Sequence, residues 1–367
     1  MAASEQDTLD LSARLEQGWA LPAQWYSDPS ILEIEREVIF RPAWRFGGLL
    51  KDVAEPGQFM TRTVGNTPVV IVRGRDGELR AFVNVCRHRG AAVASGCGHA
   101  TTLQCPYHAW TYDLDGSLRA APRSDREPSF DKDELGLMPV RVDTWGPVVF
   151  VNLDADAPPL LDALGVLPDA LARTGVDFGS LSWHSSTPFD MSANWKVVAE
   201  NYLECYHCAV AHPGFTKLVE TGPDDYELRV EGNVLIAESP LRPNPGADAP
   251  KMDTTGVVPK TFFDLVWPST TFNVFGGPSN LLLYFFEPVT TGRTYGEFHY
   301  FFGDDADAEY REDLIRFFDE VGNEDLQLVE SVQAGLESGA VPNGRLMPDT
   351  EFLIQTYQRR VYEALTG

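Results

Sequence analysis

Two short segments, Cys86-Arg87-His88 and Cys105-Pro106-Tyr107-His108, each place a cysteine close to a histidine, and sixteen residues separate them. Thiolate sulfur and imidazole nitrogen both bind transition metals, so each segment offers one ligand of each kind. The repeated pairing predicts a single metal centre with two thiolate and two imidazole ligands.

Two kinds of centre use this ligand set. In a Rieske [2Fe–2S] cluster one iron takes two thiolates and the other two imidazoles, and the imidazoles raise the reduction potential above that of an all-cysteine ferredoxin. A structural Cys2His2 zinc site is the alternative. Zinc fingers usually place both cysteines before both histidines, whereas each segment here mixes the two. The order therefore favours a Rieske cluster held by Cys86, His88, Cys105 and His108.

The residues around both segments resemble the Rieske domains of ring-hydroxylating oxygenases. The similar stretches are Asn84-Val-Cys86-Arg-His88-Arg-Gly90 and Cys105-Pro-Tyr-His108-Ala-Trp-Thr-Tyr-Asp-Leu-Asp-Gly116. Rieske proteins of respiratory complexes, as the family pattern implies, carry a cysteine where this chain has Tyr107 and bridge it to the other ligand loop. Tyr107 excludes that disulfide, which favours the soluble oxygenase or ferredoxin branch. Cys97 is expected to be a small buried thiol.

Composition narrows the possible partners and the compartment. The chain has 367 residues, enough for two or three core-bearing units, and its formal net charge of −25 opposes binding to nucleic acid or anionic membranes. It contains no apolar run of bilayer length, and its polar start does not resemble a signal peptide. The number of cysteines, five, is odd, and two of them are already assigned to the cluster. A disulfide framework is therefore unexpected, and we expect a cytoplasmic protein.

Periodicity predicts an α+β fold in two domains. We expect a helix over 29–40, with Asp28 as N-cap, Pro29 in the first turn, and an apolar stripe of Ile31, Ile34, Val38 and Ile39. A β-sandwich-like Rieske domain is predicted over 41–157, with strands near 59–64, 68–72, 79–85 and 146–153.

Residues 1–40 and 158–367 are predicted to form a catalytic domain, an antiparallel sheet flanked by helices. Its expected elements are helical spacing over 194–209, a loop-rich stretch over 221–257, strands over 270–275, 280–286 and 294–302, and a helix over 307–336 interrupted at Gly322.

A second candidate metal site lies in the segment 194–213, where His207 and His212 are five residues apart. On an uninterrupted helix their side chains would point about 140° apart, so both can reach one ion only if the helix ends between them. Pro213 is consistent with such an end. Taken alone, two histidines at this spacing also suit a pair of hydrogen-bonded core residues.

The segment 194–212 resembles the mononuclear-iron segment of Rieske oxygenases, and the resemblance extends over roughly residues 20–360. It implies a third ligand, Asp325, with the neighbouring Glu324 as the competing carboxylate. Two imidazoles and one carboxylate form the facial triad of non-haem Fe(II) oxygenases, which leaves positions open for dioxygen. A Rieske electron-carrier protein, the alternative from another class, would leave a second metal motif and some 200 residues unexplained.

The resemblance also implies partners. No flavin or dinucleotide fingerprint is present, so electrons would come from a separate NAD(P)H-dependent reductase, with or without a ferredoxin. Family members form rings, usually homotrimers, in which one subunit's cluster faces the next subunit's iron. Glu204, one helical turn before His207, is expected to link that histidine to His108 across the interface.

Two departures from the ring-dioxygenase pattern bear on the substrate. Glu204 stands where that pattern has an aspartate, and the interval from Asn201 to Glu204 is one residue shorter than in that pattern. The sequence Glu204-Cys-Tyr-His207-Cys resembles the choline, carnitine and betaine oxygenases instead. This implies hydroxylation or oxidative N-demethylation of a small quaternary ammonium or betaine compound. The alternative is a monooxygenase, dioxygenase or O-demethylase of an aromatic compound, where an aromatic acid would need an anchor such as Lys217 or Arg293.

Three further features of the sequence can each be interpreted in two ways. The aromatic residues Phe262, Phe263, Trp267, Phe272, Phe275, Tyr284, Phe285 and Phe286 suit a sheet core or cation–π contact with a substrate. Cys205 and Cys208 suit reduced packing thiols better than a redox or metal pair. The acidic stretch 303–337 suits a solvated helical face, or the docking of a basic electron donor.

Overall fold

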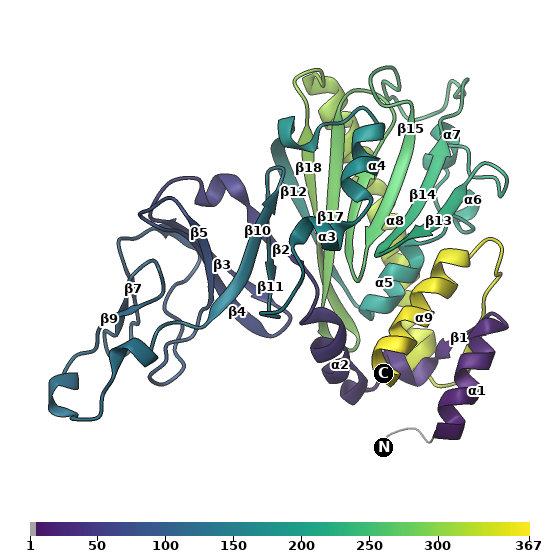
Figure 1. Ribbon diagram of the computed structural model, residues 1–367. Coiled ribbons are helices and arrows are strands. Elements are labelled where there is room, and N and C mark those ends of the chain that lie inside the picture. The colour runs from purple at the N-terminus through teal and green to yellow at the C-terminus, as the bar shows by residue number, and fades with distance from the viewer. Residues whose placement is uncertain (1–4) are drawn as a thin grey trace. The chain divides into compact units, whose positions relative to one another are not determined.

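The computed structural model describes residues 5–367 and separates the chain into two compact units (Figure 1). The smaller unit is Phe40–Ala163, and the larger unit combines the chain up to Ile39 with Leu164–Gly367. Both units contain antiparallel sheets, and the larger one adds helices, so the predicted α+β class is confirmed. No helix in the described part of the chain combines the length and apolarity that a membrane crossing requires.

The smaller unit is built from β-strands that form two sheets. Its seven-stranded sheet has the order β2-β11-β10-β5-β4-β3-β6, and a three-stranded sheet has the order β7-β8-β9. The strands are β2 (Arg45–Leu49), β3 (Gln58–Val64), β4 (Thr67–Arg73), β5 (Leu79–Val83), β6 (Cys97–His99), β7 (Leu103–Gln104), β8 (Thr111–Tyr112), β9 (Leu118–Ala120), β10 (Pro139–Trp145) and β11 (Val148–Asn152). Short 3-10 turns lie at Leu50–Val53, Ser124–Arg126 and Lys132–Glu134.

The predicted strands of this unit are confirmed, with β5 ending earlier than expected and β11 shorter at both ends. The expectation for Cys97 was wrong, because the residue lies on the short strand β6 and its side chain is exposed. The loop after β5 carries Cys86 and His88, and the loop between β7 and β8 carries Cys105 and His108.

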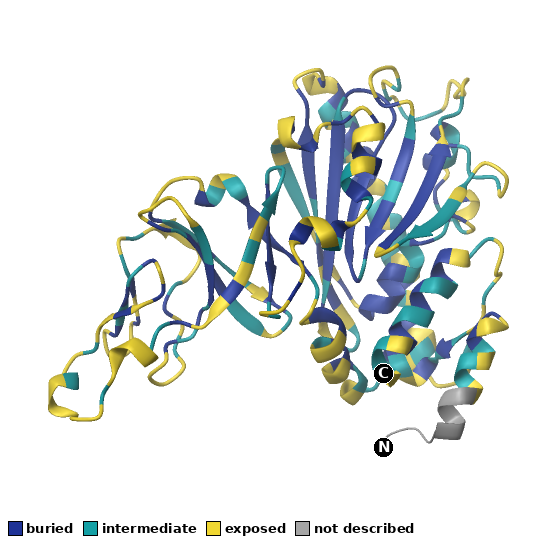
Figure 2. Ribbon diagram, in the orientation of Figure 1, coloured by how far each residue is buried: buried dark blue, intermediate teal, exposed yellow. Residues whose placement is uncertain are grey.

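The larger unit is organised around a seven-stranded antiparallel sheet of order β12-β18-β17-β16-β15-β14-β13. Its strands are β12 (Ser182–Met191), β13 (Glu227–Glu231), β14 (Val234–Pro240), β15 (Lys260–Val266), β16 (Thr270–Val274), β17 (Asn280–Thr290) and β18 (Arg293–Phe302). Figure 2 shows the central strands buried along their length, and β16 is buried at every position. A small separate sheet pairs β1 (Trp19–Pro22) with β19 (Asn343–Arg345).

The helices of the larger unit are α1 (Glu5–Glu16), α2 (Pro29–Glu35), α4 (Leu167–Arg173), α5 (Trp195–Tyr202), α6 (Cys208–Ala211), α7 (Phe215–Leu218), α8 (Ala308–Glu337) and α9 (Phe352–Thr366), and α3 (Leu160–Leu164) lies at the boundary of the units. A π-turn follows α2 over Arg36–Phe40, and 3-10 turns lie at Ala23–Tyr26 and Phe178–Ser180. The long helix α8 packs on the sheet: Leu314, Phe317 and Phe318 share one hydrophobic cluster with Phe275 and Tyr300.

Several helix predictions needed correction. The 29–40 helix begins as predicted, with the Asp28 carboxylate accepting from Ser30 N at 2.8 Å, but the stripe was wrong because Ile34 and Val38 are exposed. Glu35 is buried instead. The π-helical turn that follows has more residues per turn than an α-helix, so different residues face the core from those that the α-helical spacing predicts. The helix over 307–336 runs through Gly322 without interruption.

Two further stretches differ from expectation. The stretch 221–257 contains β13 and β14 in addition to its loops. The helical spacing over 194–209 is divided, because α5 ends at Tyr202 and α6 begins only at Cys208. This division matters for the site, since it frees the intervening residues from helical geometry.

Candidate metal centres and the cavity beside them

The two Cys-His loops of the smaller unit have matching backbone geometry. In each loop the cysteine carbonyl accepts from the amide four residues later, Gly90 or Ala109, and the cysteine amide donates to the carbonyl five residues later. Gly90 and Ala109 both have positive φ, 79° and 58°. A positive φ costs Ala109 about 1 kcal/mol, so the turn is imposed by the loop. Both loops therefore present a cysteine and a histidine in the same way.

The four side chains of these loops suit a Rieske cluster. Cys86 and Cys105 are buried free thiols in one hydrophobic cluster, whereas His88 and His108 lie at the surface with ring centroids 4.7 Å apart. The donor set is thus two inner sulfurs and two neighbouring outer imidazoles, as a cluster with one thiolate-bound and one imidazole-bound iron requires.

Tyr112 is a neighbour of the cluster site that sequence reasoning missed. Its hydroxyl lies 3.3 Å from Cys86 Sγ and accepts from Arg87 N at 3.0 Å. Since the oxygen accepts from the backbone, its proton is free to point at the sulfur. Burial raises the pKa of Tyr112, so the phenol stays protonated. Hydrogen bonds to cluster sulfurs raise reduction potentials, and Tyr112 lies within the stretch from Cys105 to Gly116 that resembles Rieske domains.

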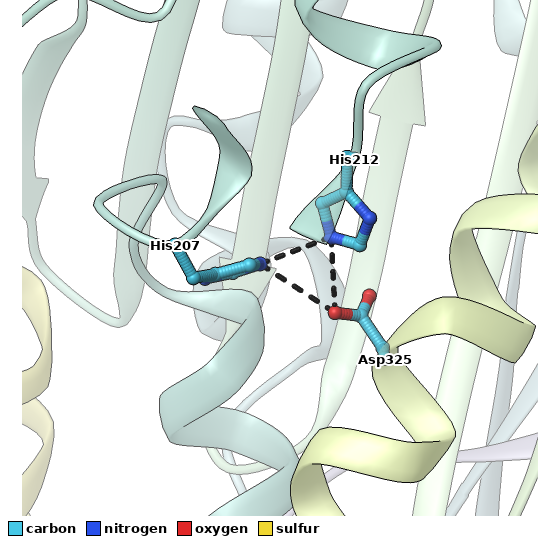
Figure 3. A group of neighbouring side chains, drawn as sticks. All are labelled: His207, His212 and Asp325. Carbon is cyan, nitrogen blue, oxygen red and sulfur yellow. Dashed lines mark hydrogen bonds and ion pairs between the residues drawn. The ribbon is translucent and has the colours of Figure 1, made fainter. Parts of the chain in front are cut away.

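In the larger unit, His207, His212 and Asp325 point toward one another (Figure 3). His207 Nε2 lies 3.0 Å from His212 Nε2, and Asp325 Oδ1 lies 3.5 Å and 3.1 Å from these two nitrogens. His207 and His212 cap the two ends of α6, and Asp325 comes from α8. The predicted helix end between the histidines is confirmed, because the one-turn helix α6 ends at Ala211, directly before His212.

A carboxylate lies behind each imidazole. His207 Nδ1 donates to Glu204 Oε1 at 2.5 Å, and His212 Nδ1 donates to Glu324 Oε2 at 2.7 Å. Because both Nδ1 atoms donate outward, both Nε2 lone pairs are directed at the centre, alongside an acidic oxygen. Three electron-rich atoms so close together repel one another unless a cation lies between them, so this donor set fits a divalent metal ion.

In the metal-free triad the carboxylates favour protonation of the two imidazoles. Burial by itself would lower the pKa of His207, but its hydrogen bonds to the carboxylates of Asp325 and Glu204 outweigh burial and raise the pKa to about 9. The pKa of His212 is raised in the same way, and the two imidazoles lower the pKa of Asp325. The carboxylates around the triad therefore stabilise positive charge at its centre, whether on protons or on a bound cation.

Glu204 reaches His207 by a different route from the one predicted. The expectation of one helical turn was wrong, since α5 ends at Tyr202 and Glu204 lies in the connection that follows. Its carboxylate accepts from the backbone amides of Tyr206 and His207 as well as from the imidazole. These three bonds fix the side chain, which is 11% exposed.

The connection between α5 and α6 also contains a disulfide, Cys205–Cys208, so the expectation of two reduced packing thiols was wrong. The end of α5 allows residues 205–208 to form a turn in which the two Cα atoms are 4.9 Å apart. Both sulfurs line the cavity beside the triad, on either side of His207 in sequence.

A buried polar network holds α5 in place. Lys196 and Glu35 form an ion pair with both side chains fully buried, at 2.5 Å. One turn later, the Tyr26 hydroxyl and the Gln358 amide donate to Glu200 at 2.6 Å and 3.0 Å. Breaking one partner of such a network leaves a buried charge unpaired, so α5 is held firmly against α2 and α9.

A cavity of about 120 Å³ lies between the sheet, α5 and α8, with the triad in its wall. Most of the wall is aromatic, aliphatic or sulfur-containing, and the aromatic lining residues are Phe189, Tyr202, Phe215, Tyr226, Phe263, Tyr284, Phe298 and Phe318. Of the eight aromatic residues singled out from the sequence, Phe263 and Tyr284 line the cavity. Phe262, Phe272, Phe275, Phe285 and Phe286 are buried core residues.

The two cations considered as carboxylate anchors lie elsewhere. Lys217 pairs with Asp248 at 2.8 Å, and Arg293 forms a two-pronged pair with Asp190 at 2.7 Å and 2.6 Å. Neither lines the cavity. The acidic residues of 303–337 lie mostly on the solvated side of α8, as the simpler interpretation predicted, while Glu324 and Asp325 turn toward the histidines.

Comparison with known proteins assigns both units. Residues 44–135 match the family model of the Rieske [2Fe-2S] domain, and residues 178–367 match that of the ring hydroxylating alpha subunit (catalytic domain). The carnitine monooxygenase oxygenase subunit of Acinetobacter pittii is 35% identical over 354 residues, which cover 96% of this chain and 94% of that protein. The chloroplastic choline monooxygenase of Spinacia oleracea is 32% identical, covering 89% and 74%.

A solved structure is also similar over almost the full length. The quaternary ammonium Rieske monooxygenase CntA in complex with L-carnitine superposes with a TM-score of 0.81 at 34% identity, covering 94% of this chain and 95% of that one.

Proposed function

This chain belongs to the Rieske non-haem iron oxygenases, as a catalytic alpha subunit, and from that premise we propose that it hydroxylates or oxidatively N-demethylates a small quaternary ammonium or betaine compound. Such an enzyme uses a [2Fe–2S] cluster, a mononuclear iron and dioxygen. The electrons would come from a separate NAD(P)H-dependent reductase, with or without a ferredoxin.

The observation that carries the substrate proposal is the cavity. Eight aromatic rings line it, and Glu204 and Asp325 are its carboxylates. Aromatic faces attract a desolvated alkylammonium ion by about 2 kcal/mol, and nearby carboxylates favour a cation over an anion. The similar carnitine and choline monooxygenases are named for compounds of this kind.

We assign the mononuclear iron to His207, His212 and Asp325, and the cluster to Cys86, His88, Cys105 and His108. Iron bound there would supply the activation of dioxygen. The chain's own residues hold the substrate and set the ligand geometry: Glu204 and Glu324 keep the Nε2 lone pairs of both histidines directed inward. Asn201 donates to Asp325 Oδ1 at 3.1 Å and orients the carboxylate.

Glu204 is proposed as the link between subunits. Its three hydrogen bonds to the segment of His207 leave it rigid, as an electron-transfer contact requires. In the proposed homotrimer, the carboxylate would meet His108 of the neighbouring subunit, bringing that subunit's cluster close to this iron. The proposed Rieske domain extends over 41–157, with 1–40 and 158–367 as the catalytic domain.

An Asp325→Ala variant tests the iron assignment. It should contain two irons per chain where the wild type contains three, keep the Rieske spectrum, and lose substrate-dependent oxygen uptake. A variant that retains three irons would refute the assignment of Asp325.

A Glu204→Gln variant tests communication. It should keep three irons and both spectra, yet its reduced cluster should no longer be reoxidised when substrate and dioxygen are added. Reoxidation at the wild-type rate would leave Glu204 without the proposed role.

A further inference from the structure

The disulfide Cys205–Cys208 encloses a part of the chain that serves both the proposed iron site and the proposed subunit link. Only Tyr206 and His207 lie between its cysteines, and Glu204 comes directly before it. The backbone amides of both enclosed residues donate to the Glu204 carboxylate, and the His207 imidazole donates to it as well. The ring that the disulfide closes therefore fixes the proposed iron ligand and the proposed link together.

Cys208 also positions the second histidine. Its amide donates to the Cys205 carbonyl at 3.2 Å, which closes the turn, and its carbonyl accepts from the His212 amide at 2.9 Å. Helix α6 begins at Cys208 and ends directly before His212, so a shift of Cys208 moves the backbone at both histidines. The disulfide thus controls the position of His207 on one side and of His212 on the other.

The effect of this disulfide is mainly local. Its cysteines are three positions apart, and a disulfide that closes so short a loop constrains the unfolded chain less than one that closes a long loop. In the part of the chain that the structure describes, the other cysteines, Cys86, Cys97 and Cys105, are free. The pair is therefore not part of a stabilising disulfide framework.

The two sulfurs are reached from the cavity. Both cysteines line it beside the triad, although only 9% of Cys205 and 5% of Cys208 is exposed, and the turn that they enclose reaches the surface at Tyr206. The same cysteines pack with Phe215 and Phe318 in one hydrophobic cluster. Two thiol sulfurs cannot stay at bonding distance, and in a closely packed wall they can separate only if the turn moves.

We propose that Cys205 and Cys208 are a reversible redox switch of the iron site. As a disulfide, the pair holds His207 and Glu204 in the arrangement of the structure. As two thiols, it releases the turn, which weakens Fe(II) binding and interrupts electron transfer from the cluster. This inference rests on the proposed function, because the iron and the cluster belong to it.

Thiol–disulfide exchange with a dithiol opens the switch. The S–S bond between the cysteines breaks, an S–S bond forms within the dithiol, and two protons and two electrons pass from the dithiol to the cysteine sulfurs. Hydrogen peroxide, the two-electron reduction product of dioxygen, closes the switch. Two S–H bonds and the O–O bond break, the S–S bond forms again, and two water molecules leave. Since peroxide forms where dioxygen is reduced without oxidising a substrate, the closing reagent can arise in the same cavity.

Counting thiols tests whether the switch exists. The protein is unfolded in N-ethylmaleimide and weighed by mass spectrometry, which should show three labelled cysteines in the oxidised protein and all five after treatment with dithiothreitol. Cys97→Ser, which removes an exposed thiol of the smaller unit, is the control and should lower both counts by one. Five labels both before and after peroxide treatment would show that the pair forms no disulfide and would overturn the inference.

Fe(II) affinity tests what the switch does. The dithiol form, freed of reagent under argon and titrated at its apo catalytic site, should bind Fe(II) about tenfold more weakly than the disulfide form, as expected when metal-bound histidines lose their orienting contacts. Peroxide added before the iron, and then removed by catalase, should restore the affinity. The Cys205→Ser/Cys208→Ser variant should show the weak affinity after every treatment, whereas Cys97→Ser should respond as the wild type does.

Electron transfer is measured on the same two forms of the holoenzyme. Reoxidation of the reduced cluster by substrate and dioxygen should be at least tenfold slower in the dithiol form. Equal Fe(II) affinity and equal reoxidation rates in the two forms would overturn the inference and leave the proposed function intact. If Fe(II) affinity followed the thiol count but no quaternary ammonium compound accelerated reoxidation in either form, the switch would stand and the proposed function would fail.

Discussion

At the scale of single residues, the proposed iron site is defined by the carboxylates that lie behind its two histidines. Glu204 and Glu324 accept hydrogen bonds from Nδ1 of His207 and His212, which leaves Nε2 of each neutral imidazole available to a metal ion. The two carboxylates differ in origin, because Glu204 belongs to the connection after α5 and Glu324 to α8. Glu324 therefore orients its histidine from the neighbouring helix, next to the ligand Asp325 in sequence.

Removing the Glu324 carboxylate should loosen His212. We expect Glu324→Ala to weaken Fe(II) binding about 10- to 100-fold, the usual effect of losing a group that orients a metal-bound histidine, and Glu324→Gln to weaken it less because its oxygen still accepts. The measurement is an equilibrium Fe(II) titration of the apo catalytic site, with the cluster absorbance as an internal check. Glu320→Ala, one turn away on the same face of α8, is the matched control.

If Glu324→Ala abolished iron binding while Asp325→Ala preserved it, the two carboxylates would have to exchange roles. Unaltered affinity in Glu324→Ala would mean that its contact with His212 is incidental.

Six of the seven proposed ligand residues lie in short local motifs, and Asp325 is implied by the family resemblance. Cys86, His88, Cys105 and His108 stand out by their spacing together with flanking residues that resemble Rieske domains. The structure brings together His207, His212 and Asp325, as the family resemblance implied. The role of Glu324 could not be predicted as easily, since the sequence places it beside Asp325 without showing which carboxylate turns to which nitrogen. Tyr112 and the Cys205–Cys208 disulfide depend on turns that form only in the fold.

At the scale of elements, α8 shows why a glycine was misread. Gly322 was expected to interrupt the helix because glycine is about 1 kcal/mol less favourable than alanine in a helix. Instead it allows close packing: a Cβ at this position would lie 2.9 Å from Phe189 Cζ and 3.3 Å from Phe298 Cε2. The glycine is thus explained by the cavity wall, which the periodicity of one segment does not reveal.

Two substitutions in α8 separate these effects. Gly335→Ala should stabilise the protein by up to about 1 kcal/mol, because a Cβ there meets no atom within 4 Å. Gly322→Ala should lower stability by about 1–3 kcal/mol, since the crowded rings must shift. Denaturant unfolding followed by circular dichroism measures both. Equal stabilisation by the two variants would contradict the packing explanation.

The central strands were predictable because their apolar runs are bounded by turns, and β16, β17 and β18 lie close to where they were expected. The apolar stripe of α2 was not predictable. Its buried side contains Glu35, whose ion pair with Lys196 on α5 stabilises a charged residue inside the protein. No local pattern indicates which glutamate has a distant lysine.

At the scale of the whole molecule, one buried carboxyl should govern part of the pH dependence of stability. Asp264 on β15 is 4% exposed, and within the described chain its Oδ1 has no hydrogen-bond partner. Burial, with a contribution from Glu238, raises its pKa to about 7 from an ordinary value of 3.8. The folded state therefore retains a proton that the unfolded state loses, and stability falls as the pH rises from about 4 to about 7.

Asp264→Asn should remove this dependence. Its midpoint of thermal unfolding should exceed that of the wild type by several degrees at pH 8 and by much less at pH 5, since each pKa unit corresponds to about 1.4 kcal/mol. Differential scanning fluorimetry across this range measures it. Asp190→Asn is the control: that exposed carboxylate has a lowered pKa beside Arg293, so its loss should give no gain at high pH. If the unfolding midpoints of wild type and Asp264→Asn changed with pH in parallel, the pKa of Asp264 would not be raised in the folded state.

The central claim is that the two metal centres act together on a quaternary ammonium substrate, and one measurement tests it most directly. The holoenzyme is reduced at its cluster, freed of reductant, and mixed with dioxygen in a stopped-flow instrument with or without choline, carnitine, glycine betaine or a methoxybenzoate. We predict that cluster reoxidation is slow without substrate and with the benzoate, and accelerates at least tenfold with a quaternary ammonium compound, with stoichiometric formation of its oxidised product. Acceleration by the benzoate and by no ammonium compound would contradict the account.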